Sequence, residues 1–136
     1  MRAGRMTAGQ ERGWQQGFPE FGLTLTNGIL DWDASFGGAG RRVVEIGFGM
    51  GDSLLSMAQA DPETQFVGIE VHRPGVGRLL AQVMAKEVFN LRVFADDAVE
   101  VMSQCLAPDS IDGIHIFFPD PWHKKRHHKR RLIQPL

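Results

Sequence analysis

Three glycines alternate with other residues directly after a short apolar run, and this is the first place where the sequence could do chemistry. The run Val43–Ile46 suits a buried strand, and the glycines lie in the segment Gly47–Gly51 that follows. Glycine has no Cβ, so such a turn lets a ligand approach the main chain closely. The dinucleotide fingerprint needs glycine at its sixth position, where this chain has Asp52, and the spacing therefore argues against NAD. An ordinary tight turn between a strand and a helix is the alternative interpretation.

Acidic residues follow the second and third apolar runs of the chain. Glu70 comes directly after the run Gln65–Ile69, where a carboxylate could accept hydrogen bonds from both hydroxyls of a ribose. Asp97 follows the third run, and its natural partner is the exocyclic amine of an adenine, with Asp96 expected at the surface. Either aspartate could instead cap the helix that follows, and this alternative stays open.

A rigid acidic segment and a basic run come near the end of the sequence. Asp120 lies between Pro119 and Pro121, which restrict the main chain, and Trp122 offers an aromatic face for stacking. The basic run, residues 124–131, holds six of the fifteen lysines and arginines, and removing these charges from the net charge of −1 leaves −7 on the rest. This concentration predicts a polyanionic partner, with a solvated surface or a localisation signal as the alternatives.

The apolar pattern predicts a fold that brings these residues together. Strands are expected at residues 42–46, 65–69, 91–95 and 111–118, with helices at residues 52–60, from Pro74 onward and after Asp97, where Val99 should face the core. A short helix is expected from a cap at Thr7 to about residue 16, and residues 23–40 should be irregular. Strands that alternate with helices predict an α/β fold with a parallel sheet. The strands' carboxyl ends then meet at one edge, where such sheets bind ligands.

The composition limits the class of protein. With 136 residues, 43% of them hydrophobic and 23% charged, the chain has the character of one soluble globular domain. No apolar run approaches the ~20 residues of a membrane span, and the N-terminal residues lack a signal peptide's apolar stretch, so a cytoplasmic location is expected. Cys105 is the single cysteine and is expected to fill the core. The histidines of the basic run lack acidic partners at ligand spacing, so no metal site is predicted.

Several segments together resemble the bacterial tRNA (guanine-N7-)-methyltransferase family: Glu45–Gly51, Gly68–His72, Asp97–Glu100 and Phe118–Arg131. The glycine turn is similar to the first motif of Rossmann-like methyltransferases that use S-adenosyl-L-methionine (SAM). The resemblance spans about Arg5 to the last residue. It implies a Rossmann-like class I methyltransferase fold with the first four strands of the sheet present. Residues 1–41 would then be an N-terminal segment and residues 42–136 an incomplete methyltransferase domain.

The resemblance also implies roles for individual residues. The residues that would bind SAM are Glu45, Gly47, Gly49, Gly51, Glu70, Asp97 and Asp120. Asp120 would also be the catalytic residue. The residues that would contact tRNA are Lys124, Arg126, His127, His128, Lys129, Arg130 and Arg131. The implied reaction is methylation of N7 of the guanine at position 46, in the variable loop of tRNA.

Members of this family continue past the point where this chain stops, so the chain is expected to be a fragment that is inactive by itself. The strand over residues 111–118 would then have an unpaired outer edge through which fragments associate, whereas the full-length parent should be a monomer or homodimer. A SAM methyltransferase of a small molecule or a protein is one alternative function, and the basic run argues against it. A non-catalytic RNA-binding module of the same fold is another, and cofactor affinity would distinguish it.

Overall fold

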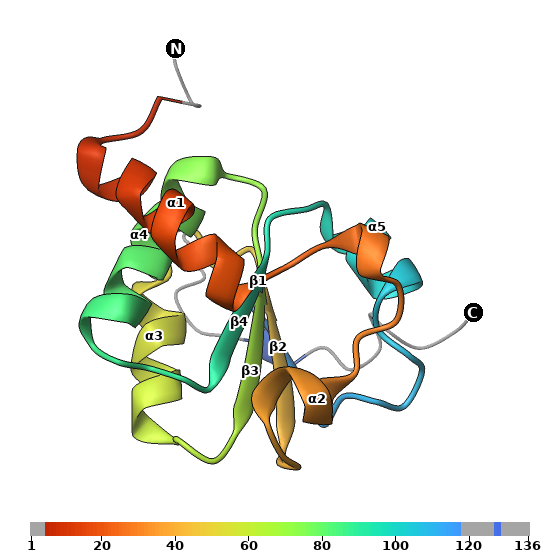
Figure 1. The fold of residues 1–136 in the computed structure, drawn as a ribbon. Coiled ribbons are helices and arrows are strands. Elements are labelled where there is room, and N and C mark those ends of the chain that lie inside the picture. The colour runs from red at the N-terminus through yellow and green to blue at the C-terminus, as the bar shows by residue number, and fades with distance from the viewer. Residues whose placement is uncertain (1–4, 118–126, 129–136) are drawn as a thin grey trace.

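The computed structural model describes residues 5–117 and 127–128, in which strands and helices alternate along most of the chain (Figure 1). The strands are β1 (Gly22–Leu23), β2 (Arg42–Ile46), β3 (Gln65–Ile69), β4 (Leu91–Phe94), β5 (Gly113–Ile116) and β6 (His127–His128). The helices are α1 (Ala8–Phe21), α2 (Trp32–Phe36), α3 (Asp52–Ala60), α4 (Arg73–Ala85) and α5 (Ala98–Gln104), with a 3₁₀ turn, η1, at Leu25–Asn27.

The six strands form one sheet in the order β1-β4-β3-β2-β5-β6. All neighbours from β1 to β5 pair in parallel, which confirms the expected α/β fold with a parallel sheet. The number of strands differs from the expected four, because short strands are added at both edges. At one edge, Gly22 and Leu23 pair with Val93 and Phe94 of β4. A two-residue strand has too little periodicity to be recognised in the sequence, so only its partner reveals it.

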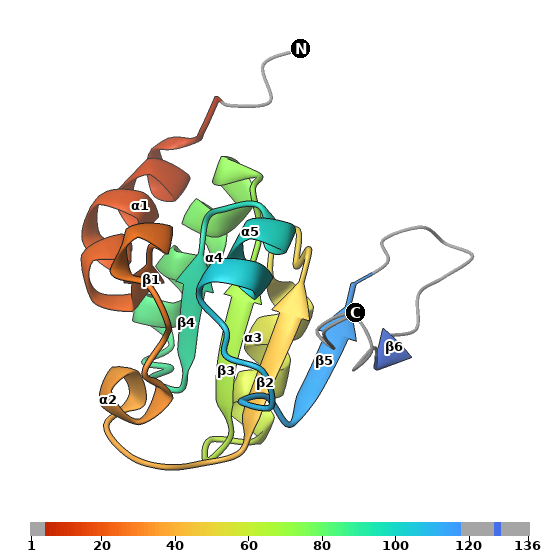
Figure 2. The same cartoon turned by 90° about the vertical axis from the view of Figure 1, so that its right-hand side faces the viewer.

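Helices cover both faces of the sheet, as Figures 1 and 2 show. Helices α1, α3 and α4 enclose one core, which includes Val43 of β2, whereas η1, α2 and α5 pack over the other, which includes Val44. This alternation explains why the strands are apolar at nearly every position. In α5 the buried residue is Val101, and the expectation that Val99 faces the core is wrong because its side chain is 74% exposed. Cys105 is buried in the core, as expected.

Helix α1 is longer than expected and packs closely on α4. Thr7 caps it through a reciprocal pair of hydrogen bonds with Gln10, but the helix continues through Pro19 to Phe21. Two buried glycines, Gly13 and Gly17, lie on the side of α1 that faces α4. A Cβ on Gly13 would collide with the carbonyl oxygen of Gly77, so glycine is needed for these helices to approach each other. The sequence predicts that this helix ends near Gly17 and Pro19, but the close contact with α4 favours the helical conformation beyond them.

The region expected to be irregular, residues 23–40, contains the end of β1, η1 and α2, and Arg92 of β4 holds it in place. The Arg92 guanidinium lies between the rings of Phe21 and Phe36, 5.4 and 4.8 Å from their centroids. It also donates a hydrogen bond of 2.8 Å to the carbonyl oxygen of Ser35. Burial lowers the pKa of Arg92, an effect that nearby Glu20 opposes. One half-buried side chain thereby connects the end of α1, helix α2 and the sheet.

The outer edge of β5 is partly paired, which corrects the expectation of a bare edge there. His115 and Ile116 pair with the two residues of β6 in an antiparallel arrangement. Main-chain groups that were expected to form a template for association between fragments therefore already have partners over this short stretch. Separately, none of the helices in the described part of the chain is both long and apolar enough to span a membrane.

Candidate functional site

The glycine turn adopts a main-chain conformation that other residues rarely accept. Gly47, Gly49 and Gly51 have φ angles of 71°, 66° and 86°, in the left-handed region that favours glycine. Two main-chain hydrogen bonds fix the turn: the N–H of Gly47 donates to the carbonyl oxygen of Ile69, and that of Gly51 donates to Phe48. Glycine is therefore required at each position by the main chain itself, before any ligand is considered.

The three glycines differ in what lies beside them. A Cβ on Gly51 would come within 2.9 Å of Leu79 in α4, and one on Gly49 would meet the ring of Phe117 at 3.6 Å. A Cβ on Gly47 would meet nothing within 4 Å. Gly51 thus serves packing against α4, whereas Gly47 borders open space. The prediction that the turn admits a ligand fits this geometry best at Gly47.

Helix α4 also begins against this turn, which the sequence did not indicate. A Cβ on Gly75 would collide with the carbonyl oxygen of Gly49. Glycine has a low helix propensity, so a glycine in the first turn of a helix is a signal in the sequence that could have indicated a close contact there. Gly75 therefore allows α4 to support the turn directly.

Glu70 is bonded to the glycine turn. One carboxylate oxygen accepts a hydrogen bond of 2.7 Å from the N–H of Gly49, and the other accepts one of 3.0 Å from the N–H of His72. The side chain is half-buried. A carboxylate has about four acceptor positions, so two remain for a ligand. Glu70 can therefore hold the turn in place and still accept hydrogen bonds from a diol.

Glu45 is completely buried in the middle of the sheet. It lies in β2 opposite Gly68 of β3 and His115 of β5, two residues before the glycine turn begins. The predicted contact between Glu45 and a cofactor remains a prediction.

Asp97 caps helix α5, as the alternative interpretation allowed. Its carboxylate accepts a hydrogen bond of 3.2 Å from the N–H of Glu100, and the residue is exposed at the end of the loop that follows β4. Capping and contact with an adenine are compatible, because the cap uses one carboxylate oxygen and the other can still accept a hydrogen bond.

Asp96 is half-buried, so the expectation that it lies at the surface is wrong. Burial raises the pKa of the Asp96 carboxyl. Its charge also raises the pKa of the Cys105 thiol, although burial of the thiol is the larger cause. The order of two adjacent aspartates in a loop gives no signal of which one turns inward, so the sequence could not separate them.

The described site residues meet at one edge of the sheet. The glycine turn follows β2, Glu70 follows β3 and Asp97 follows the loop after β4, and these three strands are adjacent and parallel. A hollow of about 970 Å³ opens at the opposite edge, among residues 36–41, 58–59, 61–65 and 86–90, and none of the predicted site residues lines it. The carboxyl edge, with open space at Gly47 and acceptors on two flanking loops, is the place where a nucleoside with a ribose diol would fit.

Several predicted residues lie outside the described part of the chain, namely Asp120, Lys124, Arg126, Lys129, Arg130 and Arg131. Of the basic run, the structure describes the main chain of His127 and His128, which form β6 beside β5. Among the described residues, no group of three His, Cys, Asp or Glu side chains is placed to hold a metal ion.

Comparisons with known proteins show which family the chain is similar to. A family model described as "Putative methyltransferase" matches residues 40–136. The chain is 56% identical to a tRNA (guanine-N(7)-)-methyltransferase of Stutzerimonas stutzeri, over 99% of this chain and 57% of that protein. It is 58% identical to the protein of the same name from Pseudomonas savastanoi pv. phaseolicola, over 99% of this chain and 55% of that protein. The chain thus spans little more than half the length of these relatives.

A solved structure of Haemonchus contortus phosphoethanolamine N-methyltransferase 2 in complex with S-adenosyl-L-methionine resembles the chain weakly. The TM-score is 0.47 at 20% sequence identity, over 60% of this chain and 18% of that one.

Proposed function

We propose that the intact protein methylates tRNA with SAM as the methyl donor. This chain belongs to the putative methyltransferase family, and it is 56–58% identical to bacterial tRNA (guanine-N(7)-)-methyltransferases. The proposed target is N7 of the guanine at position 46 in the variable loop. The observation that carries the proposal is the bond between Glu70 and the glycine turn at the carboxyl edge. It gives this edge a preformed acceptor for a ribose beside an open approach at Gly47.

The described residues fit the cofactor. Glu70 would accept hydrogen bonds from the ribose hydroxyls, and Asp97 would accept one from the adenine amine. Gly47 would allow the cofactor to come close to the main chain, with Glu45 and Gly49 in the same segment. When bound, SAM supplies an electrophilic methyl group on a positively charged sulfur. The protein's contribution is to hold this group in line with the nucleophile.

The chemistry of guanine N7 requires no general base, because this nitrogen carries a free lone pair at neutral pH. Positive charge develops on the guanine ring as its N7 forms a bond to the methyl group. A carboxylate beside the ring can orient it through its N–H groups and stabilise that charge. We assign this role to Asp120, whose flanking prolines restrict its main chain.

The basic run at residues 124–131 would bind tRNA phosphates and supply much of the affinity. A methyltransferase for a small molecule would have no need of six basic residues in eight positions. The protein is expected to act in the cytoplasm, where tRNA is available.

The test is a methylation assay on the intact protein with an unmodified tRNA transcript, comparing the wild type with Asp120→Asn. We expect the variant to keep its fold and its tRNA affinity and to lose activity by orders of magnitude, because the stabilising charge is needed mainly in the transition state. A transcript in which position 46 is not guanine is the substrate control. If the variant turns over at a near-normal rate, the role of Asp120 is wrong, and if the wild type does not methylate tRNA, the proposed function is wrong.

A further inference from the structure

The N-terminal ends of α1 and α4 lie together at the carboxyl edge of the sheet. The helices run in the same direction, because Gly13 contacts α4 near Gly77 and Gly17 contacts it farther along, at Leu80. Helix α4 begins three residues after Glu70, so the start of α1 also lies at the edge that holds the glycine turn (Figures 1 and 2). The first described residues of the chain are therefore at the same edge of the sheet as the proposed cofactor site.

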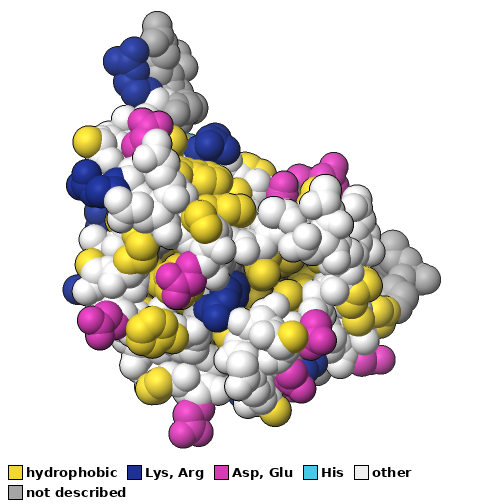
Figure 3. Space-filling model, in the orientation of Figure 1, with side chains coloured by type: hydrophobic (Ala, Val, Ile, Leu, Met, Phe, Trp, Pro, Cys, Tyr) yellow, Lys and Arg dark blue, Asp and Glu magenta, His cyan; other side chains and the backbone are white. Residues whose placement is uncertain are grey.

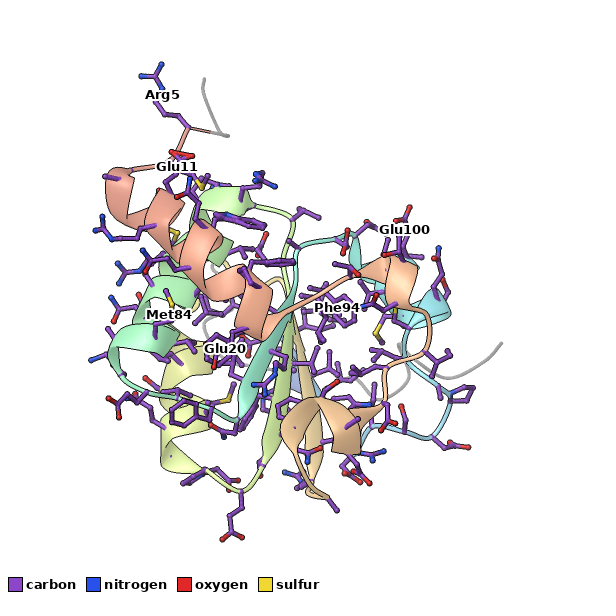
Figure 4. The ribbon with its side chains drawn as sticks, viewed as in Figure 1. Arg5, Glu11, Glu20, Met84, Phe94 and Glu100 are labelled. Carbon is purple, nitrogen blue, oxygen red and sulfur yellow. The ribbon has the colours of Figure 1, made fainter. Side chains whose placement is uncertain are left out.

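Three exposed arginines surround this end of the two helices: Arg5 before α1, Arg12 in α1 and Arg73 at the start of α4. Figure 4 shows Arg5 beyond the first turn of α1, with Glu11 near it, and Figure 3 shows dark-blue basic side chains around the upper part of the molecule with a magenta acidic side chain between them. Within residues 5–117, none of the three forms an ion pair, although Arg42 and Arg78 are paired with aspartates. These charges are therefore available to a partner.

Arg73 is held in position by an aromatic ring. Its guanidinium carbon lies 4.1 Å from the centroid of the Trp14 ring. The Trp14 indole N–H donates a hydrogen bond of 2.8 Å to the carbonyl oxygen of Arg73, and Phe18 stacks on the same tryptophan. A guanidinium that stacks on a ring keeps its N–H donors at the rim, where they can bind a phosphate. Because the side chain is already ordered, binding costs less conformational entropy.

We propose that Arg5, Arg12 and Arg73 form a second tRNA-binding surface, the α1–α4 basic surface, which contacts backbone phosphates. This inference rests on the proposed function and adds a contact surface to it. Strand β3, which precedes Arg73, and strand β6, which lies in the basic run, are three strands apart in the sheet, about 15 Å at the usual strand spacing. The glycine turn follows β2, which lies between β3 and β6. Phosphates held on both sides would place the target base over the cofactor.

The experiment measures the binding of an unmodified tRNA transcript to the intact protein by fluorescence anisotropy, over ~50 to ~200 mM salt. The variants are Arg5→Gln, Arg12→Gln and Arg73→Gln. Each phosphate contact contributes about 0.7–0.9 to the slope of log affinity against log salt, so each variant should weaken binding and reduce the slope by up to this amount. Arg41→Gln is the matched control, because Arg41 is an exposed arginine at the opposite edge of the sheet, just before β2.

The inference is overturned if the slopes of all three variants equal that of the wild type, or if Arg41→Gln reduces the slope as much as they do. Arg73→Gln also removes the contact with Trp14, so thermal unfolding is compared with the wild type. Arg5 lies outside α1 and makes no hydrogen bond with the other described residues, so Arg5→Gln tests the charge without affecting the fold. If the wild type methylates tRNA but the variants have the same slope of log affinity against log salt as the wild type, only this inference is contradicted. A wild type that does not methylate tRNA contradicts the proposed function.

Discussion

Glu70 has two main-chain partners in the structure, the N–H groups of Gly49 and His72. Replacement by alanine removes the acceptor of both N–H groups and the expected acceptor for the ribose. We expect Glu70→Ala to weaken SAM binding strongly, since hydrogen bonds to a charged group contribute ~1.5–3 kcal/mol each. Calorimetry with the intact protein measures this affinity. Glu63→Ala, an exposed acid at the opposite edge, is the control, and an unchanged affinity in Glu70→Ala would remove Glu70 from the site.

Asp96 predicts a dependence of stability on pH. Burial raises its pKa in the folded state above the unfolded value of about 3.9, so the folded state binds this proton more tightly. The resulting stabilisation is present below the unfolded pKa and is lost as the pH rises through the folded pKa. Asp96→Asn should therefore unfold at a higher urea concentration than the wild type at pH 7, with a smaller difference near pH 4. Equal midpoints for Asp96→Asn and the wild type at pH 7 would contradict the prediction.

At the scale of elements, the contact between α1 and α4 depends on glycine. A Cβ on Gly77 would collide with the carbonyl oxygen of Gln10 and come within 2.8 Å of the Trp14 ring, so α1 would have to move. We expect Gly77→Ala to lower the free energy of unfolding by ~1–3 kcal/mol, the usual cost of overpacking. In Gly9→Ala, a glycine of the same helix α1, the new methyl group makes only ordinary contacts, at 4.0 Å with side-chain atoms of Arg12 and Thr7, and it should stabilise by ~0.5–1 kcal/mol. Urea denaturation measures both, and equal stabilities would mean that the helices do not need this close approach.

At the scale of the whole molecule, residues 1–41 contribute side chains to both cores. Phe21 and Trp32 are 3% and 2% exposed, one in each core, and burying an aromatic side chain stabilises by roughly 1.5–3 kcal/mol. A protein that starts at Arg42 loses these contacts and the support that Arg92 gives to α2, out of a total stability of roughly 5–15 kcal/mol. We expect it to unfold at a much lower temperature than the chain that starts at Met1. Circular dichroism melting measures this, and equal midpoints would show that residues 42–136 are stable alone, as a separate domain would be.

Local patterns in the sequence predict the elements around the glycine turn and the edge that holds the candidate site. Strands β2 and β3 and helix α3 have the predicted bounds, because each is a short segment whose apolar pattern, turn glycines and breakers act within a few residues. The alternation of these elements implies a parallel sheet, which brings the turn, Glu70 and Asp97 to one edge. The edge that holds the candidate site could therefore be predicted from the order of the elements alone.

Features that depend on neighbours distant in the sequence follow only from the packing of the elements against one another. Strand β1 exists because β4 offers it main-chain partners, and α1 continues past Gly17 because α4 packs against that glycine. Asp97 caps α5 while its neighbour Asp96 turns inward, a choice that depends on where Cys105 and the core lie. Arg73 gains its place on Trp14 only when α1 docks on α4. Local pattern fixes which face of an element is apolar, but contacts between elements decide what each polar side chain meets.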